Sequence, residues 1–481
     1  LFLGIKSFGN KNNTLDNIKL LDTKSNNLFA IMVKDASGNY NESSTFPTGA
    51  YVLNETMSSC VDNNGNKVDN VLSYADGFVS ATTNKTIYCY LYFDKDNSVY
   101  AKVLDDYKNK NGVKKTTDEN GKDVYYYTGN ITNNNLVFNN YCWKMVRTTE
   151  TDGVKLIYNG VYKEDTKCNN TGTSVYIDSA GTSFNTKDNS PTYVGYMYGT
   201  VYTWTSKHAS SFGTYYYGSD VTWNGTTYTL SDAESGTFSN MYSKLRTKHY
   251  TCLSTSSSCS TVYYIFYINP ATNRETYYIT LTNGKKIEDA LDEMLNYNTT
   301  NSNIKTVIDN WYKNNMTKVT DYLENAIYCN DRSIVELGGW NPSGGRVTSV
   351  LIFNDYYNPG SLTCYDKEDQ FTLNVDSGGT LGYGNNALDY PVGLLTSREA
   401  ELTIDESSSS YLNNGDYFWL LSPIVINEYK AMLYNFYNDG LYKFSTVNET
   451  HGTRPAISLK KNIKISGGTG EIEDPYTLSL N

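Results

Sequence analysis

The chain has 481 residues, which is more than one ordinary hydrophobic core can hold, so its length predicts two or three domains. A formal net charge of −11 and a pI near 4.9 exclude nucleic acid as a partner, because phosphate binding needs clustered Lys and Arg. Hydrophobic residues make up 39% and charged residues 19%, a composition typical of a folded protein and not of a disordered one.

Residues 1–26 are a polar segment, rich in Asn and Lys, with too few apolar residues to fold alone. The segment opens with LFLGI before it turns polar, as we expect of the end left by processing of an export segment. Strand addition to the sheet edge of another copy would, repeated head to tail, build a filament. The residues expected to make this contact are Leu1, Phe2, Leu3, Ile5, Ile18, Leu20 and Leu21.

Residues 27–97 are predicted to form a small β domain. Apolar runs, LFAIMV at 28–33 and IYCYLYF at 87–93, are separated by turns rich in Gly and Asn, and the second run shows the alternation of a strand. In one of these turns Asp62 and the two Asn that follow at alternate positions are spaced as in a calcium loop. Lys67, however, stands where an EF-hand needs glycine, so an Asx-rich hairpin turn is the competing interpretation.

Residues 98–116 are predicted to be a connector with a helix at 99–107, because Val99, Val103 and Leu104 recur at helical spacing. The larger domain is expected to follow at 117–481. Its first strands are predicted at 135–138, 141–147 and 154–158. An Asp-Gly pair between the last two of these strands predicts that they form a hairpin.

Apolar residues at helical spacing predict two helices in the middle of the chain, at 287–295 and from 304 to as far as 326. The stretch 391–396 is expected to lead into a short helix. Thr396 is the predicted N-cap of that helix, and Glu399 stands where it would complete a capping box.

The last quarter of the chain carries three predicted strands. The first, YFWLLSP at 417–423, is expected to end in a Ser-Pro turn; the second, LYNFYNDG at 433–440, runs into an Asp-Gly corner; the third, GTRPAISL at 452–459, begins on glycine. We expect Trp419 to pack in the core. Arg454 is expected to fix the last strand through hydrogen bonds to nearby carbonyls, with contact to a ligand as the alternative.

In order and spacing these strands resemble the closing strands of C-type-lectin-like domains, including an uncharacterised domain of Firmicutes cell-surface proteins. More distantly they resemble the formylglycine-generating-enzyme and phage-tail lectin-like folds. The Trp-x-x-x-Arg strand at 143–147 and the stretch at 193–199 are similar to the same family, and 27–97 resembles a module that often precedes its lectin-like domain. The resemblance implies an α+β protein, with a small N-terminal β domain before a large C-type-lectin-like α+β domain with antiparallel strands.

Eight cysteines without a Cys-x-x-Cys pair favour disulfides over zinc sites, although eight buried free thiols are the alternative. Eight cysteines allow 105 connectivities. Pairing of neighbours in chain order is the expected arrangement: Cys60 with Cys89, Cys142 with Cys168, Cys252 with Cys259, and Cys329 with Cys364. Catalytic relatives use a cysteine pair close to the final strands, but no cysteine follows Cys364, so the resemblance carries over the fold and not that activity.

The sequence contains none of the common catalytic motifs, such as a nucleophile elbow, a Walker loop or His-Glu-x-x-His. His451 is expected to be a solvated turn residue. The carboxylate pairs Asp105-Asp106 and Glu471 with Glu473 are expected on the solvated surface. The sequence therefore predicts no catalytic residue, no metal ligand and no cofactor.

The 46 Tyr and the abundance of Asn, Ser and Thr favour β structure and exposure outside the cell, although an AT-rich genome would give the same bias. We expect a secreted or surface-exposed bacterial protein with a structural or adhesive role, such as a self-assembling filament subunit whose partners are copies of itself. A lectin-like protein that binds host or environmental glycans without assembly is the alternative, and an enzyme whose site escapes motif analysis is a third. Tyr clusters at 125–127, 215–217 and 263–264 could stack on sugars or form cross-strand pairs.

Overall fold

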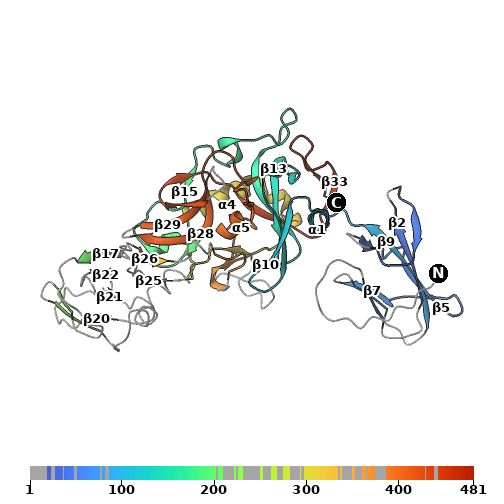
Figure 1. Ribbon diagram of the computed structural model, residues 1–481, viewed down its shortest axis with the longest axis horizontal. Helices are drawn as coiled ribbons and strands as arrows, with labels where there is room; N and C mark the ends of the chain where they lie inside the picture. The colour runs from blue at the N-terminus through green and yellow to red at the C-terminus, as the bar shows by residue number, and fades with distance from the viewer. Residues whose placement is uncertain are drawn as a thin grey trace. The chain divides into compact units, whose positions relative to one another are not determined.

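The computed structural model forms two compact units, Leu1–Asn111 and Gly112–Asn481 (Figure 1). It describes residues 19–22, 28–35, 37–47, 51–75, 78–81, 86–201, 293, 297–333, 336–337, 349–352, 360–364, 367–373, 386–427, 430–437 and 442–480, and the backbone of separate strands between 204 and 281. Strands dominate the described residues and helices are few, which is a mixed α+β fold.

The first unit is built on a six-stranded sheet. Its strands are β2 (Leu28–Lys34), β3 (Tyr40–Ser43), β4 (Tyr51–Leu53), β5 (Ser59–Asp62), β6 (Lys67–Val68) and β9 (Ile87–Lys95). They lie in the order β3-β2-β9-β5-β6, with β4 also paired to β9. The central strand β9 alternates as predicted, since Cys89, Leu91 and Phe93 are buried while Tyr90 is exposed.

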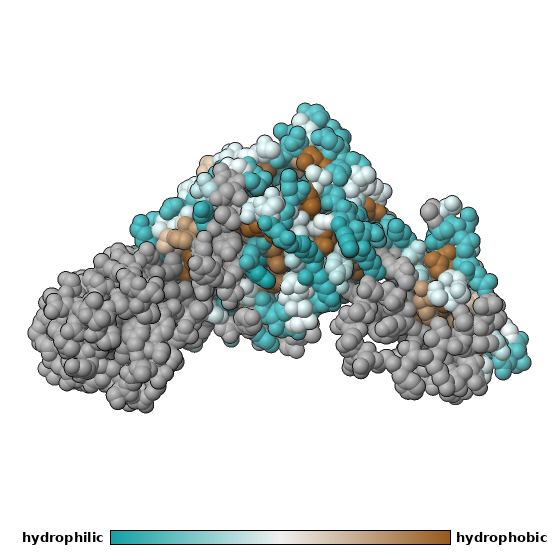
Figure 2. Space-filling view, in the orientation of Figure 1, coloured by the Kyte–Doolittle hydropathy of each residue, from teal (hydrophilic) through white to brown (hydrophobic). Residues whose placement is uncertain are grey.

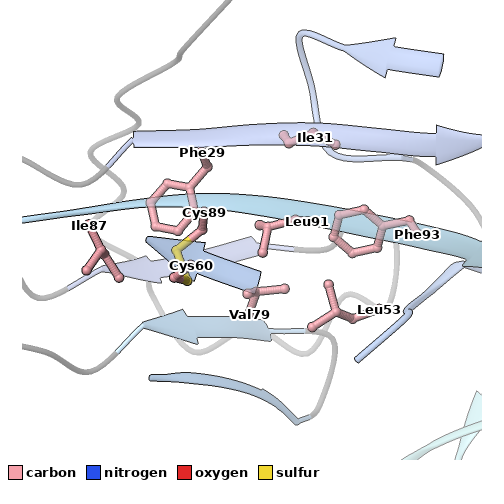
Figure 3. Close-up of a cluster of buried hydrophobic side chains, with 9 residues drawn as sticks. All are labelled: Phe29, Ile31, Leu53, Cys60, Val79, Ile87, Cys89, Leu91 and Phe93. Carbon is pink, nitrogen blue, oxygen red and sulfur yellow. A yellow bond between two sulfur atoms is a disulfide. The ribbon is translucent and has the colours of Figure 1, made fainter. Parts of the chain in front are cut away.

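The buried face of this sheet carries the core of the first unit (Figure 3). Cys60 on β5 lies directly opposite Cys89 on β9, and the two are joined by a disulfide. Val79, from a second sheet of the order β1-β8-β7, packs into the same cluster. The strands of that sheet are β1 (Lys19–Asp22), β7 (Leu72–Ala75) and β8 (Phe78–Ala81).

The helix predicted at 99–107 is present as α1 (Val99–Lys108). Ser98 is its N-cap, and the Ser98 hydroxyl accepts a hydrogen bond from the backbone N–H of Ala101 at 3.1 Å. The division between the two units falls at Asn111, just after this helix.

The second unit contains a second six-stranded sheet, in the order β10-β11-β13-β14-β32 with β12 paired to β13. Its strands are β10 (Val113–Thr117), β11 (Asp123–Tyr127), β12 (Asn135–Phe138), β13 (Tyr141–Thr148), β14 (Val154–Val161) and β32 (Ala456–Leu459). The predicted hairpin joins β13 to β14, and Asp152 in its turn takes a left-handed backbone with φ +64°.

A five-stranded sheet in the order β25-β26-β28-β29-β30 contains the first two predicted closing strands. Its strands are β25 (Glu336–Leu337), β26 (Ser349–Ile352), β28 (Phe418–Asn427), β29 (Lys430–Phe436) and β30 (Tyr442–Thr446). The prediction that the first strand ends in a Ser-Pro turn is wrong, because β28 continues through Ser422 and Pro423. The register shifts on both sides of Pro423 form a bulge, which accommodates a residue that has no N–H to donate.

The helices of the second unit follow local sequence signals. In α5 (Ser397–Leu402) the predicted capping box is present: the Thr396 hydroxyl accepts from the Glu399 N–H at 3.0 Å, and the Glu399 carboxylate accepts from the Thr396 N–H at 2.9 Å. The helix α4 (Asn303–Asn315) ends earlier than predicted and gives way to a 3-10 helix, η3 (Thr317–Tyr322). The β-branched residues that follow Met316 favour this change, because their side chains crowd the preceding helical turn.

The remaining described elements are short. They are the 3-10 helices η1 (Gly172–Val175), η2 (Pro191–Val194) and η4 (Lys367–Asp369), and the strands β15 (Thr182–Ser183), β16 (Met197–Tyr198), β17 (Trp204–Ala209), β18 (Val221–Trp223), β19 (Thr226–Leu230), β20 (Tyr250–Cys252), β21 (Val262–Tyr267), β22 (Glu275–Leu281), β23 (Thr300–Asn301), β24 (Tyr328–Cys329), β27 (Gln370–Phe371), β31 (Thr450–His451), β33 (Lys464–Gly467) and β34 (Thr477–Ser479). The helix predicted at 287–295 lies, except for Glu293, outside the described residues.

The described surface on the face drawn in Figure 2 is mostly hydrophilic, with small and separate hydrophobic areas. Among the described helices, none has both the length and the apolar character needed to cross a membrane.

Candidate functional site

Three of the expected cysteine pairs are disulfides in the structure: Cys60–Cys89, Cys142–Cys168 and Cys329–Cys364. All six of these cysteines are buried. Cys259 lies outside the described residues, and so does its expected pairing with Cys252.

Trp419 lies in the core of the second unit, with 1% of its surface exposed. Its indole N–H donates to the carbonyl oxygen of Thr182 at 2.7 Å, and Phe184 packs edge-on against its ring. The indole therefore ties the strand β28 to the segment around β15, and it does not line an open pocket.

Arg454 is also buried, and its hydrogen bonds to described residues all reach neutral oxygens. The guanidinium donates to the carbonyl oxygens of Tyr158 at 2.9 Å and Leu412 at 3.0 Å, and to Asn159 Oδ1 at 3.0 Å. Its cation also lies over the ring of Phe418. Burial lowers the pKa of Arg454 to about 10. The side chain thus holds three segments together just before the last strand of the sheet.

The residues expected to mediate assembly are only partly described. Leu20 and Leu21 lie in β1, which pairs in parallel with β8 of the same chain. The others, Leu1, Phe2, Leu3, Ile5 and Ile18, lie outside the described residues.

Two residues expected in solvent are instead packed against protein, so those expectations are wrong. The ring of His451 contacts the rings of Trp419 and Tyr417, and burial lowers the pKa of His451 below its usual value of 6.5. Asp106 is 2% exposed, and its carboxylate accepts from the Lys102 ammonium and from the Asn111 amide. His451 is covered by Trp419, which is distant in the sequence, whereas Asp106 is held by Lys102 and Asn111, four and five residues away.

At the turn that was considered for calcium, Asp62 Oδ1 accepts from the backbone N–H groups of Asn64 and Asn66, each at 2.9 Å. The turn joins β5 to β6. This geometry is that of the Asx-rich hairpin turn, in which the carboxylate oxygen serves the backbone.

Of the Tyr clusters, Tyr125 and Tyr127 are buried on β11 and so cannot present their faces to a sugar. The cluster at 215–217 lies outside the described residues, and the one at 263–264 is described in backbone only, as part of β21.

A buried ionic network that sequence reasoning missed lies at the centre of the second unit. Glu399 Oε1 is 2.6 Å from Arg147 Nε and 2.7 Å from Lys155 Nζ, and all three side chains are at most 1% exposed. Burial alone would raise the pKa of Glu399, but the two cations lower it. Lys155 Nζ also donates to the carbonyl oxygen of Ile327. We interpret this network as structural, because each charge has a partner inside the core.

Cys329, Asp331 and Cys364 bring potential metal ligands together among the described residues. The two sulfur atoms are bonded to each other, and metal binding requires thiolates. The Asp331 carboxylate accepts from the Ser361 hydroxyl at 2.6 Å. The cluster therefore does not fit a metal ion while its disulfide is intact.

The feature that best fits a binding site is a cavity of about 460 Å³ in the second unit. Its walls come from four loops and from the sheet between them. The loops are 130–132 before β12, 168–171 after β14, 408–414 after α5, and the turn at Ile472 between β33 and β34; Lys144 on β13 and Asn159 on β14 complete it.

Hydrogen bonds between the loops fix the shape of this cavity. Gly129 exchanges backbone hydrogen bonds with the 403–411 segment, donating to Thr403 O and accepting from Tyr411 N–H, each at 2.9 Å. The Asn414 amide donates to Gly172 O at 3.1 Å, and the Cys168 N–H donates to Ile472 O at 3.2 Å. The Cys142–Cys168 disulfide ties the second loop to β13. The walls are therefore largely preformed, as is usual for ligand sites.

Neutral polar side chains dominate the wall, and some of their atoms have no partner. The described lining consists of Asn130, Ile131, Thr132, Lys144, Asn159, Cys168, Asn169, Asn170, Thr171, Ser408, Ser409, Ser410, Tyr411, Leu412, Asn413, Asn414 and Ile472. Among the described residues, the buried Tyr411 hydroxyl and Asn414 Oδ1 make no hydrogen bond within the protein. Both atoms are closed to solvent, and a buried polar atom without a partner costs about 1–3 kcal/mol.

Lys144 is the charged residue of the described lining, and it is 8% exposed. Its ammonium donates to Asn135 Oδ1 at 3.0 Å and lies 5.9 Å from the centre of the Tyr411 ring. Burial, together with the nearby Arg454 cation, lowers the pKa of Lys144 to about 7.

No protein-family model, curated protein or solved structure matches this chain. Its function therefore has to be inferred from the chemistry of the site itself.

Proposed function

We propose that this chain is an extracellular adhesive protein whose larger unit has a C-type-lectin-like fold and binds glycans in the cavity between the 130–132, 168–171 and 408–414 loops. The observation that carries the proposal is the lining of that cavity, which consists mainly of amide and hydroxyl side chains on loops fixed by hydrogen bonds.

An extracellular location is supported by the three disulfides, because disulfides persist in oxidising compartments and are rare in the cytosol. Cys60–Cys89 is placed in the core of the small first unit, where a covalent link adds most to a limited hydrophobic core.

The lectin-like interpretation of the larger unit is supported by the closing segment. Trp419 and Arg454, which lie in the strands that carry the resemblance, are both buried and both join segments distant in the sequence. The order of the strands and these two anchors together favour the C-type-lectin-like fold as our proposal.

The lining suits a sugar because each hydroxyl of a sugar both donates and accepts hydrogen bonds. An Asn side chain offers two donors and an acceptor oxygen in a fixed plane, so a wall rich in Asn and Ser can satisfy several hydroxyls at once. The volume of about 460 Å³ lies within the range of about 300–1,000 Å³ of small-molecule sites. The apolar Ile131 and Ile472 are partly exposed in the lining and can contact the carbon faces of the ring.

We assign binding and not catalysis to this cavity. Catalysis of glycoside hydrolysis usually needs a pair of carboxyl groups flanking the bond. None of the described lining residues is Asp or Glu.

The proposal is tested by screening the full chain on a glycan array and repeating the screen with a variant of the cavity rim. Asn413 is exposed at the rim, so Asn413→Trp should block the entrance without disturbing the core. The matched control is Asn448→Trp, at an exposed turn residue before β31. We expect glycan binding by the native chain and by the control and its loss in the rim variant. A native chain that binds no glycan, or a rim variant that binds like the native chain, would contradict the proposal.

An edge strand favours a second candidate function, which is self-assembly into a filament through the N-terminal segment. Among the described strands β1 lies at the end of its sheet, so one of its edges carries no described partner strand. Exposed edges are sites of strand addition between copies. Deletion of residues 1–25 should leave a chain that retains its disulfides but forms no fibres in electron microscopy, while the native chain forms them. Fibres formed by the shorter chain, or none formed by the native chain, would rule out this mode of assembly.

A further inference from the structure

The charge of the cavity wall is opposite to that of the protein as a whole. The chain has 51 acidic and 40 basic residues, and yet the described lining has one cation, Lys144, and no carboxylate. A second cation, Arg454, stands directly behind the wall and donates to two lining residues, to Asn159 Oδ1 and to Leu412 O. The local field inside the cavity is therefore positive.

Neither of these two cations has an ion pair among the described residues. The Lys144 ammonium donates to the neutral Asn135 Oδ1, and the Arg454 guanidinium donates only to carbonyl and amide oxygens. The core of the same unit shows the contrast, because there Lys155 and Arg147 share the carboxylate of Glu399. Buried charges are normally paired. Lys144 lines the cavity, and Arg454 contacts two residues of its lining.

Glu399 acts electrostatically on Tyr411, but its carboxylate is paired with Arg147 and Lys155. The acidic side chains close to the lining in the sequence do not line the cavity. The Asp405 carboxylate serves its own loop, since Asp405 Oδ1 accepts from the N–H groups of Ser407 and Ser409 at 2.9 Å. Glu471 and Glu473 flank Ile472 in the sequence, but both are exposed and neither lines the cavity.

We infer that the natural ligand of this cavity is an anionic sugar whose carboxylate, as in a uronic or sialic acid, pairs with the Lys144 ammonium. This inference rests on the proposed glycan-binding function and specifies its ligand. The carboxylate would supply the acceptors that Lys144 lacks, and the hydroxyls of the ring would meet the amides of the wall.

Proton linkage gives the inference a distinct signature. Burial and Arg454 lower the pKa of Lys144 to about 7 in the free protein, whereas a bound carboxylate favours the charged amine. Affinity for the anionic sugar should therefore be highest below pH 7 and fall as the pH rises, by up to about a hundredfold at pH 9, as Lys144 loses its proton. A neutral sugar gains nothing from the charge on Lys144 and should not follow this course.

The experiment measures the dissociation constants of four probes from the full native chain by isothermal titration calorimetry at pH 6 and pH 9. The probes are glucuronate, its neutral methyl ester, N-acetylneuraminate and glucose, and acetate serves as a control for adventitious anion binding. We expect at least one of the two acids to bind about tenfold or more tighter than the neutral sugars at pH 6, with the advantage lost at pH 9. The comparison of acid with methyl ester uses only the native protein and so does not depend on the folding of any variant.

Lys144→Met supplies the second measurement, because it keeps most of the length of the side chain and removes the charge. The variant should lose the preference for the acid, so that glucuronate and its methyl ester bind it with equal affinity. Equal affinity for glucuronate and its methyl ester, with sugar binding intact, would overturn the anionic ligand and leave the proposed function standing. Acetate that binds as tightly as the acids would likewise reject the sugar acid as ligand. If none of the sugars binds and no glycan on the array binds, both the anionic ligand and the proposed glycan-binding function are rejected.

Discussion

The buried Lys144 gives the most discriminating prediction for stability. Its substitution should raise the free energy of unfolding at low pH and lower it at high pH. The pKa of Lys144 is lowered in the folded chain from 10.5 to about 7. A lowered pKa means that the unfolded chain binds the proton more tightly. The protonated amine therefore destabilises the fold fully below pH 7, and the cost disappears as the pH rises from 7 toward 10.5. Lys144→Met removes this cost and the pH dependence with it.

The magnitude follows from two opposing effects. The fall in pKa corresponds to at most about 5 kcal/mol below pH 7, at about 1.4 kcal/mol for each pH unit. The substitution also leaves Asn135 Oδ1 without the donor at 3.0 Å, which costs about 1–3 kcal/mol. We expect Lys144→Met to raise the free energy of unfolding by about 1–3 kcal/mol at pH 6 and to lower it by about 1–2 kcal/mol at pH 10.

The assay is urea unfolding of both chains, monitored by circular dichroism, between pH 6 and pH 10. The contrasting variant is Lys155→Met, which removes a buried lysine whose ammonium is 2.7 Å from Glu399 Oε1. Loss of that partner leaves a buried carboxylate under-compensated and should destabilise by about 3–5 kcal/mol. If Lys144→Met is destabilising at pH 6, or if its effect is the same at every pH, the reasoning from an unpaired buried amine is refuted.

Three further predictions concern the residues that hold the fold. Replacing both Cys60 and Cys89 by Ser should destabilise the first unit by about 2–4 kcal/mol in urea unfolding, because the unfolded chain loses its crosslink; no change would mean that the bond adds nothing to stability. Trp419→Ala should cost about 3–5 kcal/mol by the same assay, since it opens a cavity and leaves Thr182 O without its donor, and a cost below about 1 kcal/mol would contradict its place in the core. Glu399→Gln should cost about 3–5 kcal/mol, because two buried cations lose their common partner, and a neutral result would show that they find another.

Local signals predicted the parts of the fold that depend on a few adjacent residues. The alternation at 87–93, the Asp152-Gly153 corner and the Thr396–Glu399 capping box each specify a structure through contacts within one turn or one strand. The Ser422-Pro423 pair misled because its outcome is decided by distant strands. Pairing with β26 and β29 carries β28 through the proline by a bulge, and no local pattern contains that information.

The cavity could not be read from the sequence, because its walls come from segments up to about 340 residues apart along the chain. Runs such as SSSSYLNN at 407–414 predict a loop and say nothing of what the loop faces. One signal was nevertheless present. Lys144 stands between apolar neighbours in CWKMV at 142–146. A lysine inside a buried strand is normally paired with a carboxylate, so a lysine in this pattern indicates either a buried ion pair or a functional site. The prediction that His451 is solvated was wrong because the Trp419 ring that covers it is distant in the sequence, so the local pattern around His451 does not show the contact.

The negative net charge of the chain and the positive charge at the cavity act on a ligand over different distances, so added salt weakens the first effect more than the second. A ligand that carries one negative charge is repelled at long range by a protein of net charge −11, but this repulsion is screened beyond the Debye length, which is about 10 Å at 0.1 M ionic strength. The attraction of Lys144 acts at hydrogen-bond distance inside a buried site, where salt screens it much less. Moderate salt should therefore leave the affinity for a carboxylate sugar unchanged or raise it. A patch of exposed lysines would show the opposite dependence, since its attraction for an anion is lost as salt is added.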